Sequence, residues 1–134
     1  MSHYNKGSSF ERSLKKKLEA QGFYVIRSAG SGVDGLSPDL IVLSTTKKFA
    51  IECKAVESEY LAIDSSKMER MHQFELATGL PVYVAWKHNY KEPVLVPLSM
   101  FERQEKSFTI KSANANFGMT LDQISGKTPA NPRN

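Results

Sequence analysis

Two carboxylates and a lysine stand at a spacing that suits metal-dependent hydrolysis of phosphodiesters. Asp39 follows a proline, and the string Glu52-Cys53-Lys54 comes shortly after it. Mg²⁺ prefers oxygen ligands and usually takes one or two carboxylates together with water and phosphate oxygens. Asp39 and Glu52 are therefore candidate metal ligands, and Lys54 is a candidate for positioning the attacking water or stabilising the developing charge. The alternative is an ion-pair cluster at the ends of two strands.

A β-hairpin is expected to bring these groups together. Segments 39–44 and 48–54 are apolar and rich in β-branched residues, and a short polar turn separates them. A turn centred between them places Asp39 opposite Glu52 or the residue after it. Residues two apart on a strand share a face, so Glu52 and Lys54 point the same way. The hairpin therefore predicts three charged groups at one end of an otherwise apolar unit.

An amphipathic helix over residues 8–21, ended by Gly22, is predicted to precede the hairpin. Its core stripe consists of Phe10, Leu14 and Leu18. Glu11 lies beside this stripe and has two possible roles. It forms a capping box with Ser8, or it leans over the sheet and joins the metal site through a water.

The excess of positive charge lies at the start of the chain. The formal net charge is +4, and residues 1–27 hold six basic and two acidic residues, so the rest of the chain is balanced. Such asymmetry is typical of proteins that bind polyanions. The lysine run 15–17 is also typical of a solvated helix face. Beside a candidate phosphodiesterase site, we favour nucleic-acid binding.

A glycine-rich loop connects the next strand, expected at 23–27, to Asp39. Small residues let backbone N–H groups approach a phosphate closely. Arg27 at the base of the loop and Ser31 within it are candidate side-chain donors. The loop has no Gly-Lys pair, so it is not a P-loop.

Length and composition predict a single globular domain. We expect residues 1–124 to form the domain and residues 125–134 to form a flexible polar tail. No apolar run is long enough for a membrane span and no signal peptide is visible, so the expected location is intracellular (cytoplasmic or nucleoid-associated). The single cysteine, Cys53, excludes an internal disulfide and is expected to be a small core residue. Neither a zinc-type cluster nor an organic cofactor is indicated.

The remaining elements are predicted to complete a mixed sheet. A second helix over residues 65–78 begins with a Ser66–Glu69 capping box and is ended by a glycine. Strands are expected at 82–87 and 94–97, followed by a short helix at 98–103. This order predicts an α/β fold with helices packed on the sheet.

Short strings of sequence carry a family resemblance. They are Lys6-Gly7, Phe10-Glu11-Arg12, Gly22-Phe23, Arg27-Ser28-Ala29-Gly30-Ser31, Pro38-Asp39 and Ile51-Glu52-Cys53-Lys54. Together they resemble the archaeal-type Holliday junction resolvase family of the PD-(D/E)xK nuclease superfamily, over about residues 6–120. The resemblance implies a restriction-endonuclease-like mixed sheet of about five strands flanked by helices.

The resemblance also implies an activity and a set of site residues. The expected protein is a Mg²⁺-dependent homodimer, with Mn²⁺ as a substitute, that binds four-way DNA junctions and cuts two opposing strands symmetrically in recombination and repair. The implied catalytic residues are Glu11, Asp39, Glu52 and Lys54. The implied metal ligands are the same three carboxylates and the backbone carbonyl of Cys53. The expected DNA contacts are Lys6, Arg12, Lys15, Arg27, Ser31 and Lys67.

Two points stay open at the level of sequence. Met71 and Phe74 on the second helix are candidates for the dimer interface, but both also suit the core of a single domain. The activity has two alternatives: another nuclease of the superfamily that acts on duplex DNA, or a DNA-structure-binding module without catalysis.

Overall fold

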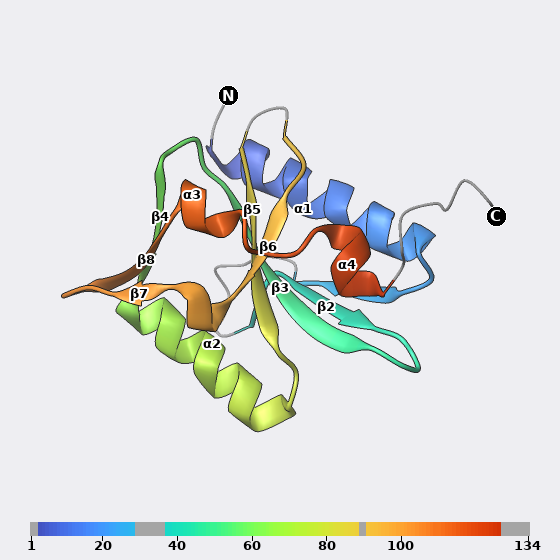
Figure 1. The fold of residues 1–134 in the computed structure, drawn as a ribbon. Coiled ribbons are helices and arrows are strands. Elements are labelled where there is room, and N and C mark those ends of the chain that lie inside the picture. Colours follow the sequence, from blue (N-terminus) through green and yellow to red (C-terminus); the bar gives the residue numbers. More distant parts are fainter. Residues whose placement is uncertain (1–2, 29–36, 89–90, 127–134) are drawn as a thin grey trace.

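The computed structural model describes residues 3–28, 37–88 and 91–126, with only the backbone for residues 3–6. The strands form two sheets, and the helices flank them (Figure 1). In chain order they are α1 (His3–Ala20), β1 (Tyr24–Arg27), β2 (Leu40–Leu43), β3 (Lys48–Ala55), β4 (Tyr60–Asp64), α2 (Ser65–Thr78), β5 (Val82–Lys87), β6 (Val94–Pro97), the 3₁₀ turn η1 (Leu98–Met100), β7 (Glu102–Arg103), β8 (Ser107–Lys111), α3 (Ser112–Ala115) and α4 (Leu121–Ser125).

The larger sheet confirms the predicted α/β fold. Its order is β1-β2-β3-β5-β6, and all its pairs are antiparallel except β3 with β5. The parallel pair follows from the connection between the two strands, because β4 and α2 carry the chain back to the end at which β3 began. The predicted strands at 82–87 and 94–97 are confirmed.

A second, smaller sheet was not predicted. It has the order β4-β8-β7, and both pairs are antiparallel. Its β4 strand alternates between exposed and buried residues, with Leu61 and Ile63 pointing into the core. The predicted helix at 98–103 is wrong beyond η1, since residues 102–103 form β7. An extended backbone there allows the chain to pair with β8.

Helix α1 covers one face of the larger sheet. Leu14 and Leu18 are 1% and 0% exposed, and they pack in a cluster with residues of β1, β2 and β3. The helix begins five residues before Ser8, so the predicted Ser8–Glu11 capping box is wrong. Gly22 follows the helix at φ 95°, a left-handed conformation that suits glycine, as predicted.

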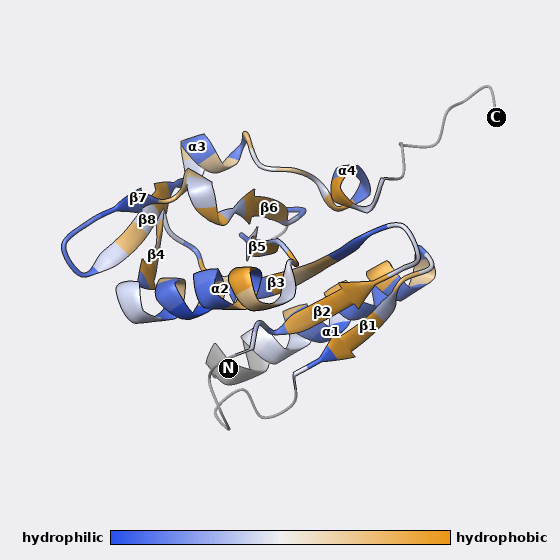
Figure 2. Ribbon diagram, turned by 90° about the horizontal axis from the view of Figure 1, so that it is seen from below, coloured by the Kyte–Doolittle hydropathy of each residue, from blue (hydrophilic) through white to orange (hydrophobic). Residues whose placement is uncertain are grey.

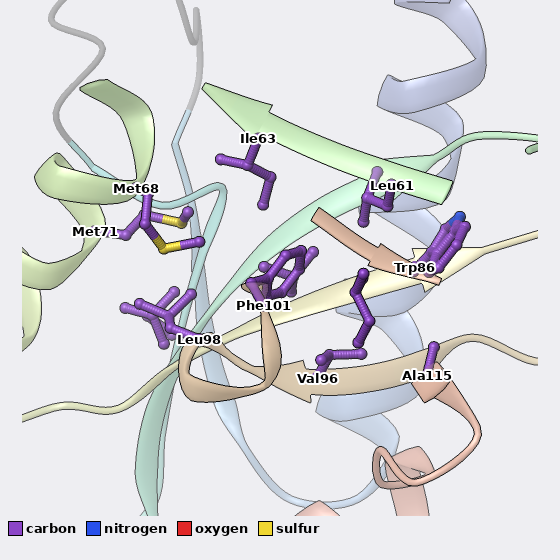
Figure 3. Close-up of a cluster of buried hydrophobic side chains, with 13 residues drawn as sticks. Leu61, Ile63, Met68, Met71, Trp86, Val96, Leu98, Phe101 and Ala115 are labelled. Carbon is purple, nitrogen blue, oxygen red and sulfur yellow. The ribbon is translucent and has the colours of Figure 1, made fainter. Parts of the chain in front are cut away.

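Helix α2 and the small sheet cover the opposite face (Figure 3). Trp86 of β5 is 1% exposed there and donates from Nε1 to the carbonyl of Val56 at 2.9 Å. Met71 is 2% exposed and points from α2 into this cluster, so its prediction as an interface residue is corrected: it belongs to the chain's own core. Phe74 is half-buried against the same cluster, and its interface role stays untested.

The termini of α2 differ in how well they were predicted. Its N-cap is Asp64, and no side-chain cap hydrogen bond forms, so the Ser66–Glu69 capping box is wrong. Glu69 instead accepts a hydrogen bond from Gln73 one turn later. Gly79 ends the helix at φ 75°, as predicted.

Within the described residues, no helix is long and apolar enough to cross a membrane.

Candidate active site

The four predicted catalytic residues line one hollow of about 460 Å³. Glu11 comes from α1, Asp39 from the residue before β2, and Glu52 and Lys54 from β3. The other lining residues come from β3, β4 and α2. They are Cys53, Ala62, Ile63, Asp64, Lys67 and Arg70. The structure therefore brings together the groups that the sequence placed in one site.

The hollow forms where β3 extends beyond β2. The register pairs Leu40 with Ile51, so the next residues of β3 have no partner on the β2 strand. Asp39 takes that place with its side chain, because its Oδ2 accepts the N–H of Cys53 at 2.8 Å. This bond fixes the Asp39 carboxylate opposite Glu52, as the hairpin predicted.

Cys53 contributes its backbone to this arrangement. Its side chain is half-buried against the α1 cluster, which agrees with the expected core role. Burial raises the pKa of its thiol well above the usual value, with Asp39 and Glu11 adding to the shift. A thiol held neutral is a poor nucleophile. Ligation of a metal by the Cys53 carbonyl stays a prediction.

Glu52 is a buried carboxylate with one oxygen in contact with two lysines. Its residue is 4% exposed, and its Oε2 lies 3.4 Å from Lys67 Nζ and 4.0 Å from Lys54 Nζ. Its Oε1 is buried and has no hydrogen-bond partner among the described residues. Burial, followed by the charge of Asp39, raises the pKa of Glu52 to about 7, although both lysines oppose the shift.

Asp39 shares this environment. It is 8% exposed, and burial raises the pKa of its carboxyl above the usual value. The hydrogen bond from the Cys53 backbone opposes that shift most, followed by the charges of Lys67 and Lys54. Two neighbouring buried carboxylates with raised pKa values form a site that gains from a cation.

Glu11 is held on the α1 side of the hollow. Arg27 donates from Nε to Glu11 Oε1 at 3.0 Å and from Nη2 to Ser8 Oγ at 3.0 Å. Burial raises the pKa of Glu11, and Asp39 adds to the shift, while Arg27 opposes it. Arg27 was predicted to contact a DNA phosphate, whereas in this structure its guanidinium positions Glu11.

The donor set fits a magnesium-type ion only in part. Across residues 3–28, 37–88 and 91–126, no group of three His, Cys, Asp or Glu side chains is close enough to hold a metal ion. Mg²⁺ needs only one or two carboxylates, because water and phosphate oxygens complete its coordination. Asp39 and Glu52 meet that need, and the free Glu52 Oε1 supports it. A water-mediated contact of Glu11 with such an ion stays a prediction.

The other predicted DNA contacts lie in different settings. Arg12 is exposed on α1, and Lys15 is paired with Glu19 at 2.8 Å. Lys67 lies inside the hollow. The side chain of Lys6, residue Ser31 with most of its loop, and residues 127–134 of the predicted tail lie outside the described residues.

Sequence reasoning assigned no role to two lining residues, Asp64 and Arg70. A signal was available for Arg70, because residues three apart on a helix share a face and Arg70 therefore accompanies Lys67. Asp64 had no such signal, because it lies on β4, a strand that the sequence did not predict.

Known proteins resemble this chain along nearly its whole length. The family model described as archaeal Holliday junction resolvase (hjc) matches residues 2–129. The crossover junction endodeoxyribonuclease Hjc of Archaeoglobus fulgidus is 34% identical over 124 residues, covering 92% of this chain and 91% of that protein. The protein of the same name from Methanocaldococcus jannaschii is 42% identical over 87 residues, covering 64% of this chain and 62% of that protein.

A solved structure extends the similarity to the fold. The 1.6 Å structure of Archaeoglobus fulgidus Hjc, titled a Holliday junction resolvase from an archaeal hyperthermophile, matches with a TM-score of 0.84 and 30% sequence identity. The match covers 93% of this chain and 99% of that one.

Proposed function

The chain belongs to the archaeal Holliday junction resolvase family, and we propose from its site how it cuts four-way DNA junctions. It is a structure-specific endonuclease, and nucleases of this family are in general metal-dependent. The observation that supports the site assignment is the buried Glu52 carboxylate beside Asp39, one oxygen of which has no hydrogen-bond partner in the part of the chain that the structure describes.

The proposed metal ligands are Asp39 and Glu52, and Mg²⁺ is the proposed ion, with Mn²⁺ as a substitute. When bound, such an ion activates water and offsets charge on the phosphate. Lys54 extends from the same face of β3 and positions the attacking water or the developing oxyanion. Glu11 orients a water at the site, and Arg27 holds Glu11 in place through the bond at 3.0 Å.

DNA binding is proposed for the exposed basic face of α1. Arg12 is exposed one residue from Glu11, so it is placed to contact a phosphate beside the hollow. Phosphate contacts of this kind are independent of base sequence, which suits recognition of a junction by its shape.

We further propose a two-fold homodimer, because paired cuts need two sites and one chain provides one. The proposed contact is the face of β1 that points away from α1. Tyr24 and Ile26 are 70% and 47% exposed there, while Val25 between them is buried under the helix. Figure 2 shows apolar residues on β1 and its neighbour β2. An apolar face on an edge strand suits a second copy related by two-fold symmetry.

The activity is tested with a synthetic four-way junction and a linear duplex of matched sequence. Cleavage of the junction with Mg²⁺, its loss with EDTA and an intact duplex are the expected results. Equal cutting of the duplex would favour another nuclease activity. An intact junction with both Mg²⁺ and Mn²⁺ would favour a non-catalytic binding module.

The dimer is tested with Ile26→Asp, which places a carboxylate on the proposed contact. We expect separated protomers by light scattering, and nicked circles in place of linear product from a cruciform plasmid. Phe117→Asp is the matched control, because Phe117 is 81% exposed near β6 at the other edge of the sheet. A wild-type protein that is monomeric on the junction and still yields linear product would contradict the proposal.

A further inference from the structure

Two lysines approach a single oxygen of Glu52, and they come from different elements. Lys54 is two residues from Glu52 on β3, whereas Lys67 reaches the same Oε2 from the first turns of α2. Lys67 is the closer of the two, at 3.4 Å against 4.0 Å. Its side chain is also the less exposed, at 23% against 35%.

The position of Lys67 has an electrostatic consequence. Glu52 and Asp39 are buried together, and a buried carboxylate without a compensating cation is unfavourable. Of the two lysines, Lys67 provides the nearer compensating charge at Glu52. A divalent cation bound to the same carboxylate would repel the ammonium group. A lysine has a flexible stem, so its charge moves to a new position without rearrangement of the helix.

We propose that Lys67 is a positioning residue that holds Glu52 in the metal-free protein and competes with the divalent ion for that carboxylate. This inference rests on the proposed function, since it assumes that Glu52 is a metal ligand. Metal binding frees the Lys67 ammonium group from Glu52. The freed group stays in the hollow, where it becomes available to a DNA phosphate. Lys67 thus acts as the phosphate contact predicted from the sequence only once the metal is bound.

The competition is tested by calorimetric titration of the protein with Mg²⁺ alone, without DNA. The titration is done well above the pKa of Glu52, which is about 7, so that protons do not compete with the ion. Lys67→Met is expected to bind Mg²⁺ about tenfold more tightly than wild type, equivalent to about 1.4 kcal/mol. Lys67→Gln removes the positive charge but keeps a hydrogen-bond donor. This variant is also expected to bind Mg²⁺ more tightly than wild type.

Two control variants separate competition from other effects. Lys67→Arg keeps the charge and should leave the Mg²⁺ affinity near the wild-type value. Lys17→Met removes one positive charge from a pair with Glu92 that lines a different hollow, and it should also leave the affinity unchanged. A purely structural role for Lys67 predicts unchanged or weaker binding in Lys67→Met and Lys67→Gln, and that result would overturn the inference. Absence of Mg²⁺ binding in every variant would instead overturn the metal site itself.

The release of Lys67 is tested by the salt dependence of junction binding, with Ca²⁺ and with EDTA. Loss of one phosphate contact reduces the slope of log K against log salt by about 1. Lys67→Gln should reduce the slope with Ca²⁺ and leave it unchanged with EDTA, where Glu52 holds the lysine in the wild type. An equal reduction under both conditions would mean that Lys67 contacts phosphate without release by metal, which contradicts the proposal.

Discussion

The two flanks of the active site differ in how firmly their charged groups are held. On the α1 flank, Arg27 makes hydrogen bonds of 3.0 Å to both Glu11 and Ser8. On the α2 flank, Glu52 has lysine contacts at 3.4 and 4.0 Å, and its other oxygen has no hydrogen-bond partner within the described ranges. Hydrogen bonds therefore hold the carboxylate on the α1 flank, whereas the α2 flank keeps its charges available for a new ligand.

Removing the charge of Glu52 or of the neighbouring Asp39 should have the largest effect on activity. Asp39→Asn and Glu52→Gln should each reduce junction cleavage by at least about a thousandfold, because several kcal/mol of transition-state stabilisation depend on the metal. Junction binding should be retained or tightened, since a negative charge facing DNA is lost. A gel assay of cutting and a binding titration read the two outcomes separately. Cleavage within about tenfold of wild type would remove the assigned residue from the set of metal ligands.

The same flank should make stability depend on pH. The pKa of Glu52 is raised from 4.5 to about 7, so the folded state binds a proton that the unfolded state has released between these values. The free energy of unfolding of the metal-free protein should therefore fall as pH rises from about 4.5 through 7, with Glu52 contributing about 3 kcal/mol. Asp39 contributes in the same direction. Urea unfolding in EDTA across this range measures the slope, and Glu52→Gln should flatten it. An equally steep slope in that variant would mean that other groups cause the dependence.

On the α1 flank, mutation of Arg27 should lower stability in addition to releasing Glu11. Arg27→Ala removes two hydrogen bonds, one of them to a charged partner, and should lower the free energy of unfolding by about 2 kcal/mol. Chemical unfolding gives the value. Arg12→Ala is the matched control, because Arg12 is exposed one residue from Glu11 and should change stability by less than about 0.5 kcal/mol. An equal loss of unfolding free energy in Arg27→Ala and Arg12→Ala would mean that the Arg27 hydrogen bonds do not stabilise the α1 flank.

The smallest expected effect concerns DNA affinity. Arg12→Ala should weaken junction binding and reduce the salt slope by about 1, as expected for a single phosphate contact. Lys16→Ala should have less effect if Lys16 faces solvent away from the DNA. Titrations at several salt concentrations measure both. Identical slopes in wild type and Arg12→Ala would place the DNA on another surface.

The hairpin that carries the site was predictable because its information is local. The apolar strands and their turn fix the register, and the register places Asp39 beside Cys53 and opposite Glu52. The ends of the helices at Gly22 and Gly79 were equally local signals. The structure confirms each of these.

The rest of the site depends on contacts between distant parts of the chain. Strand β4 forms because it pairs with β8, which follows it only after α2, β5 and β6. A five-residue segment with alternating burial gives a weak signal alone, and its partner cannot be identified from a single sequence. The role of Arg27 was missed for a similar reason, because its hydrogen bonds join β1 to residues of α1 that lie 16 and 19 positions earlier in the chain.

The parallel pairing of β3 with β5 has a consequence for the order of folding. The segment that connects the two strands carries β4 and α2, and these elements supply Ala62, Asp64, Lys67 and Arg70 to the hollow. Contacts between residues far apart in sequence form slowly, because the intervening chain must lose entropy before the contact forms. We therefore expect the Asp39–Cys53 hairpin, whose strands are close in sequence, to form faster than the rest of the site. The carboxylates of the hairpin and the α2 side of the hollow meet only where β3 pairs with β5, so we expect cutting activity only from the fully folded chain.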